Sequence, residues 1–197
     1  WQPRGIVGDM GGGSLELVEI ADKKPKQGAT FPLGGLRLSE EADGKIAKAQ
    51  KLTEAALKNF DWPDLVPGER TFYAVGGTWR AFARLHMAQY DYPLAVMHGY
   101  SMSADDTRNF AHLLDRLSPS SLEGINAISK ARRETVPYGA LVLERIIRAV
   151  KPSRVVISAF GVREGIMYRL MSHGKRQRDP LLAGCEEMAM QRSRSPE

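Results

Sequence analysis

Apolar and polar residues alternate along the first part of the chain with the two-residue period of β-strands. Residues 5–10 are small or β-branched, and the run Gly11-Gly12-Gly13 interrupts them. Residues 14–20 alternate again, with a one-residue slip that predicts a β-bulge. A polar turn over residues 21–26 leads to a third strand over residues 29–33. These segments predict a three-strand meander whose first hairpin closes on the glycines.

Apolar residues then recur with the spacing of amphipathic helices, interrupted by two short apolar strands. We predict helices over residues 46–60, 79–89, 104–117, 136–150 and 164–171, a short helix with a turn over 119–130, and strands over 72–75 and 154–159. Residues 91–102 are expected to be irregular. Near the end of the sequence, Lys175–Arg178 is predicted to be a basic linker. Asp179 is predicted to cap a helix that extends to Met190. A meander followed by strand–helix units predicts an α/β fold, with a mixed sheet and helices packed on it.

The composition is that of a folded globular chain: 43% of the 197 residues are hydrophobic and 26% are charged. No apolar run reaches the roughly 18–20 residues of a membrane span. The single cysteine, Cys185, excludes a disulfide within the chain and a cysteine zinc cluster, which favours a reducing cytoplasm. Because the chain begins at Trp1 and enters a strand by Gly5, we expect it to be a piece of a longer protein.

Charge is distributed unevenly along the chain. Residues 1–127 hold 14 basic and 16 acidic side chains, a net charge of −2, whereas residues 128–197 hold 14 and 7, a net charge of +7. A basic second half fits a polyanionic partner such as a nucleic acid, a nucleotide or polyphosphate. It fits equally well a set of charges that only solvate helix surfaces.

The segment with the most chemical information is Asp9-Met10-Gly11-Gly12-Gly13-Ser14-Leu15-Glu16. It lacks the Gly-Lys-Ser/Thr of a P-loop, and it runs into a strand and not into a helix, unlike a dinucleotide fingerprint. Consecutive glycines leave backbone N–H groups uncovered, so that an anion can approach. A hairpin folded about Gly12 and Gly13 sets Asp9 opposite Glu16, an unfavourable pair unless a cation or a proton lies between them. The segment therefore predicts a phosphate and Mg²⁺ site; the alternative is a glycine-rich hairpin with two solvated acids.

Three further segments are candidates for phosphate contacts. Gly76-Gly77-Thr78 joins a strand to a helix, where free N–H groups and a capping Thr78 make a second phosphate loop beside the first. Arg163 follows the last strand and either binds phosphate or pairs with Glu164. Arg132 and Arg133, predicted to precede a helix, either track a polyanion or solvate a turn.

Taken together, these motifs resemble those of the exopolyphosphatase/guanosine pentaphosphate phosphohydrolase (Ppx/GppA) family. The resemblance rests on residues 9–17, on Gly76-Gly77-Thr78, on the stretch from Arg133 through Gly139-Ala140, and on Arg163-Glu164-Gly165. It extends from about Gly5 to Tyr168. It implies one ribonuclease H-like lobe of the actin/sugar kinase/Hsp70-like (actin-like ATPase) core, namely the second of two lobes, over residues 1–172. Residues 173–197 are then a basic linker and the start of a helical C-terminal region.

The resemblance also implies a role for each matching residue. Asp9 matches the residue linked to magnesium, and Glu16 matches a catalytic glutamate. The phosphate-binding positions are Gly11, Gly12, Gly13, Ser14, Gly76, Gly77, Thr78 and, less specifically, Arg163. Arg132 and Arg133 remain candidates for holding a trailing polyanion.

The implied activity is release of terminal orthophosphate from inorganic polyphosphate, by magnesium-assisted attack of water. The family's other catalytic glutamate lies in a Ser-Gly-x-Glu-Glu-Ala segment of the first lobe, which this chain does not contain, so the chain alone is expected to be inactive. The alternatives are hydrolysis of guanosine pentaphosphate and a non-catalytic module that senses polyphosphate or nucleotide. The expected partners are the substrate, the first lobe of the same protein and a second copy in a homodimer; neither a membrane nor a nucleic acid is expected.

Overall fold

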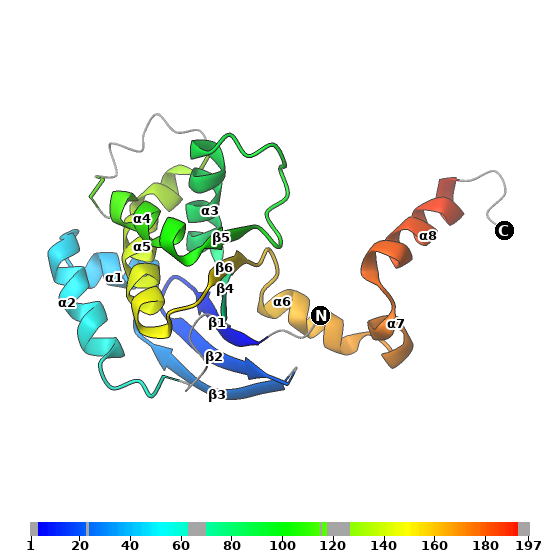
Figure 1. Ribbon diagram of the computed structural model, residues 1–197, viewed down its shortest axis with the longest axis horizontal. Helices are drawn as coiled ribbons and strands as arrows, with labels where there is room; N and C mark the ends of the chain where they lie inside the picture. Colours follow the sequence, from blue (N-terminus) through cyan, green and yellow to red (C-terminus); the bar gives the residue numbers. More distant parts are fainter. Residues whose placement is uncertain (1–3, 23, 63–69, 115, 118–126, 193–197) are drawn as a thin grey trace. The chain divides into compact units, whose positions relative to one another are not determined.

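The computed structural model describes residues 4–22, 24–62, 70–114, 116–117 and 127–192 (Figure 1). Two compact units make up the chain, residues 1–159 and residues 160–197, and each is described by itself. The division falls between the last strand and the helix that follows it. The boundary after residue 172 that the resemblance implies lies inside the second unit and stays a prediction.

A six-stranded mixed sheet with the strand order β3-β2-β1-β4-β6-β5 forms the first unit. Its strands are β1 (Gly5–Met10), β2 (Leu15–Ala21), β3 (Lys24–Phe31), β4 (Thr71–Val75), β5 (Ser101–Ser103) and β6 (Arg154–Ile157). β1, β2 and β3 form an antiparallel meander, whereas β4 is parallel to β1 and β6 is parallel to β4. The predicted meander and mixed sheet are confirmed.

Both edges of the sheet differ from the sequence prediction. β3 begins at Lys24 and contains Pro25, in a stretch that the sequence predicted as a turn. Proline is tolerated there because β3 is an edge strand, where one side of the backbone needs no partner. At the other edge, β5 pairs with β6 inside a stretch predicted to be irregular, and its three residues are too short to show a period. The predicted bulge is confirmed by a register shift between Val18 and Ile20.

Five helices accompany the sheet in the described part of this unit. They are α1 (Gly35–Glu41), α2 (Ile46–Leu57), α3 (Gly77–Gln89), α4 (Ala104–Leu114) and α5 (Lys130–Val150). α1 was not predicted, because it has only seven residues and begins at Gly35, the second of two glycines that indicated the end of an element. The short helix predicted over residues 119–130 lies largely outside the described residues.

Helix α5 begins six residues earlier than predicted, which places Arg132 and Arg133 in its first turn and not ahead of it. Proline is favoured in the first turn of a helix and disfavoured in its interior. In the structure Pro137 lies inside the helix, in a stretch from Thr135 to Glu144 that is buried throughout. Packing against the rest of the unit therefore outweighs the local signal.

The two faces of the sheet differ in burial. On one face the side chains of Ile6, Met10, Leu15, Leu17, Phe72, Val155 and Ile157 are buried, and they join the hydrophobic core with α3 and α5. On the other face the alternating positions Val7, Asp9, Glu16, Val18, Tyr73 and Val156 are only half-buried. The helices of this unit lie together on one side of the sheet (Figure 1). Asp9 and Glu16 therefore belong to the less covered face.

The second unit holds α6 (Val162–Leu170), α7 (His173–Gln177) and α8 (Pro180–Arg192). The Asp179 carboxylate accepts the backbone N–H groups of Leu181 and Leu182 at 2.9 and 3.1 Å, which confirms the predicted cap. The predicted basic linker is wrong in part, since α7 includes Lys175 and Arg176. No helix among the described residues combines the length and the hydrophobicity that crossing a bilayer would require.

Candidate functional site

The candidate site lies at the edge of the sheet where the parallel strands β1, β4 and β6 reach their carboxyl ends. Three connecting segments leave the sheet there: the glycine loop Gly11–Ser14, the turn Gly76-Gly77, and Ser158-Ala159 after β6. Pairing of β1 with β4 sets Asp9 beside Val75, so the two glycine segments begin next to each other. The carboxyl edge of a parallel sheet is where ligands bind in open α/β folds.

Asp9 and Glu16 face each other across the first hairpin. They occupy directly paired positions of β1 and β2, as the sequence predicted. Each of the two side chains is half-buried. Burial and the neighbouring Glu16 carboxylate raise the pKa of Asp9 above its ordinary value, while Arg80 opposes that shift. Two acidic groups held this close destabilise the folded chain, and a bound cation would reduce their repulsion.

Glu16 is oriented by the glycine loop itself. The Ser14 hydroxyl donates to its Oε1 at 2.6 Å, which holds the carboxylate toward the loop. Because this bond occupies the Ser14 hydroxyl proton, a contact from Ser14 to phosphate would come from its backbone N–H. The sequence singled out both residues, but their direct bond depends on the turn geometry.

Helix α1 holds the glycine loop in place. Its first N–H groups donate to the carbonyls of the loop, from Gly35 to Gly11 and from Leu36 and Arg37 to Gly12, each at 3.1 Å. The loop carbonyls are thereby turned toward α1. Among the described residues, the N–H groups of Gly12 and Gly13 donate to no backbone acceptor, and both residues are exposed. Two backbone donors next to Asp9 and Glu16 are what a phosphate group needs.

The second loop depends on glycine for its conformation. Gly76 has a φ of +108°, and a Cβ there would collide with the Met10 carbonyl of β1. Gly76 is the N-cap of α3, so the prediction that Thr78 caps this helix is wrong. The Thr78 side chain is only 2% exposed, and its methyl group packs closely on Gly139 of α5. Its possible contribution to a phosphate site is the free N–H group of the first helical turn.

Arg132 approaches this loop from α5. Its guanidinium lies against Gly77, where an added Cβ would stand 2.7 Å from the Arg132 Cζ atom. The first turns of α3 and α5 therefore place a cation beside a helix N-terminus. Arg133, in the same turn of α5, is half-buried, whereas Arg132 is exposed. Arg163 belongs to the second unit, where it is exposed in the first turn of α6.

Arg80 is a site residue that the sequence analysis missed. It lies in α3 one turn after Gly77, is half-buried, and its charge acts on Asp9. Its Nη1 also donates to the carbonyl of Ala159 at 3.1 Å, which connects α3 to the segment after β6. In the sequence, the available sign was that Arg80 follows Gly77 by three residues, which places the two on the same face of the helix, one turn apart.

The donor set fits Mg²⁺ that is held by one or two carboxylates. In the described ranges, no three side chains of His, Cys, Asp or Glu come together as metal ligands. Mg²⁺ is commonly held by one or two carboxylates, with substrate phosphates and water completing its shell. Asp9 with its paired Glu16, next to two loops of free N–H groups, matches that pattern.

Proteins of known structure share the fold of this chain. An exopolyphosphatase-like protein matches with a TM-score of 0.71, at 23% identity over 84% of this chain and 57% of that one. A Ppx/GppA phosphatase from Aquifex aeolicus matches with a TM-score of 0.70, at 19% identity over 87% of this chain and 58% of its own. The first unit therefore has the ribonuclease H-like fold of the actin-like ATPase group, as expected.

The family follows from the sequence as a whole. The model of the Ppx/GppA phosphatase family matches residues 2–173, and the chain belongs to this family. Among curated proteins, "Exopolyphosphatase 1" of Mycobacterium leprae is 28% identical over 180 residues, which cover 86% of this chain and 52% of that protein. The chain thus spans about half the length of the curated relatives it matches.

Proposed function

We propose that this chain is part of a phosphohydrolase that releases terminal orthophosphate from inorganic polyphosphate with the help of Mg²⁺. The observation that carries the proposal is the pairing of Asp9 with Glu16 beside two loops of free N–H groups. Membership of the Ppx/GppA phosphatase family and relatives called exopolyphosphatase support the choice of substrate. The part of the protein that faces this site would supply a second catalytic glutamate, and the 197-residue chain alone would be inactive.

The two loops would bind the terminal phosphate of the substrate. The first loop would offer the N–H groups of Gly12 and Gly13, and the second would offer those of Gly77 and Thr78, which begin α3. These dipoles are fixed before the substrate arrives, so they stabilise the charge that develops on the phosphoryl oxygens. Arg132 would hold the next phosphate of the chain. Phosphate binding by Arg163, which belongs to the second unit, stays a prediction.

The carboxylates would divide the remaining work. Asp9 would hold Mg²⁺, which when bound neutralises charge on the phosphate oxygens and shields Asp9 from Glu16. Glu16, with its Oε1 held by Ser14, would orient the attacking water or accept its proton. Arg80 would keep Asp9 ionised, because its positive charge lowers the pKa of that carboxyl.

Phosphate release tests the proposal most directly. Long-chain polyphosphate and Mg²⁺ are incubated with this chain and with the full-length parent protein, and orthophosphate is measured over time. We expect only the full-length parent to release orthophosphate. Glu16→Gln in the parent should lower the rate of release by about 10²–10⁴-fold, the range for loss of a general base. Glu19→Gln, in the same strand but away from the loop, is the matched control and should keep the rate.

Three results would each contradict a part of the proposal. Full activity of Glu16→Gln would remove Glu16 from the mechanism. The absence of phosphate release by either protein would exclude polyphosphate as the substrate, and guanosine pentaphosphate hydrolysis would then be assayed in the same way. Release by the 197-residue chain itself would show that no second lobe is needed.

A further inference from the structure

A polar hollow of about 500 Å³ opens between the helices α2, α4 and α5, and is called the α5 hollow below. Its polar lining consists of Gln50, His112, Arg116, Glu144, Arg145 and Arg148. Glu144 follows Arg132 by twelve residues along α5, a rise of about 18 Å at 1.5 Å per residue. The α5 hollow is therefore separate from the phosphate loops of the candidate site.

Glu144 holds two arginines of the α5 hollow in place. Its side chain is only 2% exposed, and one of its oxygens lies 3.2 Å from Arg145 Nη1. The other oxygen accepts from Nε of Arg148 and lies 3.4 Å from Nε2 of His112. A buried carboxylate needs such partners. In turn, these contacts fix the two guanidinium groups before any ligand arrives.

Positive charge exceeds negative charge in this cluster. Glu144 and Glu54, which pairs with Arg145 at 2.9 Å, balance two of the three arginines and leave a net charge of +1. Within the described ranges Arg116 takes part in no ion pair. Among the same residues, the buried Nε–H of Arg145 has no hydrogen-bond acceptor. The arginines of the α5 hollow can therefore donate to a further acceptor.

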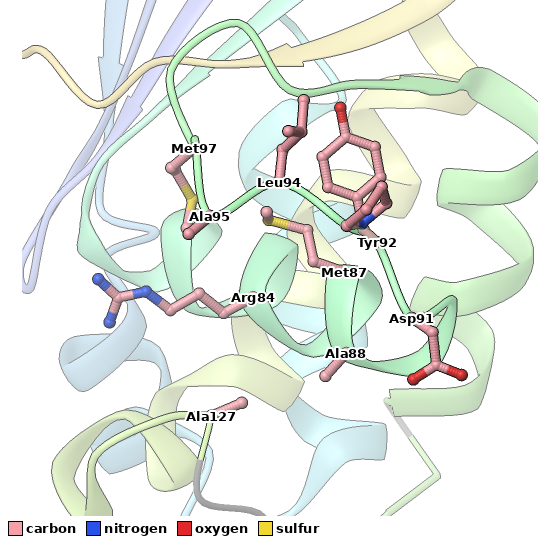
Figure 2. A pocket seen from close by; sticks show the side chains of 10 residues that line it. Arg84, Met87, Ala88, Asp91, Tyr92, Leu94, Ala95, Met97 and Ala127 are labelled. Carbon is pink, nitrogen blue, oxygen red and sulfur yellow. The ribbon is translucent and has the colours of Figure 1, made fainter.

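A second hollow, of about 630 Å³, lies beside α3 and lacks this excess of charge (Figure 2). Arg84 and Asp91 lie at its opposite ends and balance each other, and the rest of its lining is uncharged. Of these two hollows, the one at α5 is the one whose charge favours an anion.

The arginines and the size of the α5 hollow indicate the class of ligand. Guanidinium groups bind phosphate oxygens through paired N–H donors. A volume of about 500 Å³ is typical of sites for small molecules. We propose that the α5 hollow binds the phosphate group of a small ligand through Arg116 and Arg148, the ligand being a phosphorylated molecule or free orthophosphate. Beside the arginines, the Gln50 amide and the apolar side chain of Ile46 would contact the remainder of a larger ligand.

Amide NMR spectra of the isotope-labelled chain test this proposal, which does not rest on the proposed function. The chain is titrated with inorganic phosphate, with glycerol phosphate and, as the uncharged control, with glycerol. We expect both phosphate compounds to shift the amide signals of His112 and Arg148 in a saturable way, and glycerol to leave them unchanged. Tighter binding of glycerol phosphate would assign the site to a phosphorylated molecule, and equal or tighter binding of inorganic phosphate would assign it to free orthophosphate.

Substitutions separate the α5 hollow from the candidate site. Arg116→Gln should weaken the response of the hollow amides at least about tenfold, because a charged hydrogen-bond donor is lost. Its removal leaves no ion pair of the described ranges broken, so the fold should be kept. Arg108→Gln, on α4 outside the lining, is the matched control and should bind like the natural chain. Arg132→Gln should affect only phosphate-induced shifts of the glycine-loop amides, so failure of one site is distinguishable from failure of the other.

Three results would overturn the proposal. The hollow amides would not respond to either phosphate compound, glycerol alone would shift them to the same extent, or Arg116→Gln would bind as tightly as the natural chain.

Discussion

At the scale of single residues, the candidate site contains a pair of acidic side chains that destabilises the folded chain when no ligand is bound. Asp9 and Glu16 lie opposite each other on one hairpin, and burial adds to their repulsion. Arg80 offsets only part of this cost. Such a pair is better explained by a ligand than by stability, since like charges in directly paired strand positions destabilise a sheet.

The raised pKa of Asp9 leads to a prediction about stability. A group whose pKa is higher in the folded than in the unfolded state favours folding when protonated, and this contribution is lost as pH rises through the folded pKa. At neutral pH the Asp9 carboxylate therefore opposes folding, and Asp9→Asn should raise Tm by about 2–4 °C, the shift for about 1 kcal/mol. The gain should shrink as pH falls through the raised pKa of Asp9.

Thermal unfolding followed by circular dichroism between about pH 4 and pH 8 measures this effect. Adding Mg²⁺ at neutral pH should raise the Tm of the natural chain and leave that of Asp9→Asn unchanged. Asp22→Asn, in the turn after β2, serves as the control for the loss of an exposed charge. A lower Tm for Asp9→Asn at neutral pH would argue against the repulsion that we assign to this pair.

At the scale of elements, α3 and α5 pack closely together because α5 has a glycine, Gly139, where the two helices cross. Gly139 lies in the middle of α5, and a Cβ there would collide with the Thr78 methyl group and stand 3.5 Å from Met10 Sδ. The same crossing is fixed by the Trp79 indole N–H, which donates to the Gly139 carbonyl at 2.9 Å. The second phosphate loop is therefore held by the packing of α3 on α5.

Gly139→Ala should destabilise the chain, although alanine is the better helix former. The collision with the Thr78 methyl group is expected to cost about 1–3 kcal/mol. Gly165→Ala, in α6 where an added Cβ meets nothing within 4 Å, is the matched control and should be neutral or stabilise its helix by up to about 1 kcal/mol. Urea unfolding monitored by circular dichroism gives the free energy of unfolding of both variants. Equal values would contradict the close packing of α3 on α5 at Gly139.

At the scale of the whole molecule, the uneven charge favours a polyanion. The net charge of +7 belongs to residues 128–197, which contribute Arg132 to the loops of the first unit and Arg163 to the second unit. Polyphosphate binding by such a surface is largely electrostatic, so salt should weaken it steeply.

The salt dependence of binding separates Arg132 from the general positive charge. Titration calorimetry with long-chain polyphosphate, at about 50 and about 200 mM salt, gives the slope of log K against log salt concentration. By analogy with nucleic acids, Arg132→Gln should reduce that slope by roughly one unit. Arg108→Gln removes the same charge from α4 and should change the slope less. Binding that does not vary with salt would contradict an electrostatic site.

The sequence by itself determined the meander, the pairing of Asp9 with Glu16, the bulge in β2 and most of the helices, because each depends on a short-range period or on the symmetry of one hairpin. It also indicated the family, since spaced motifs survive where overall identity is low. Only the tertiary structure decided the rest. α1 and β5 are too short to show a period, and α5 passes through Pro137 because its neighbours bury it. Arg80 and Arg132 join the site only when α3 and α5 pack together, which no local pattern encodes.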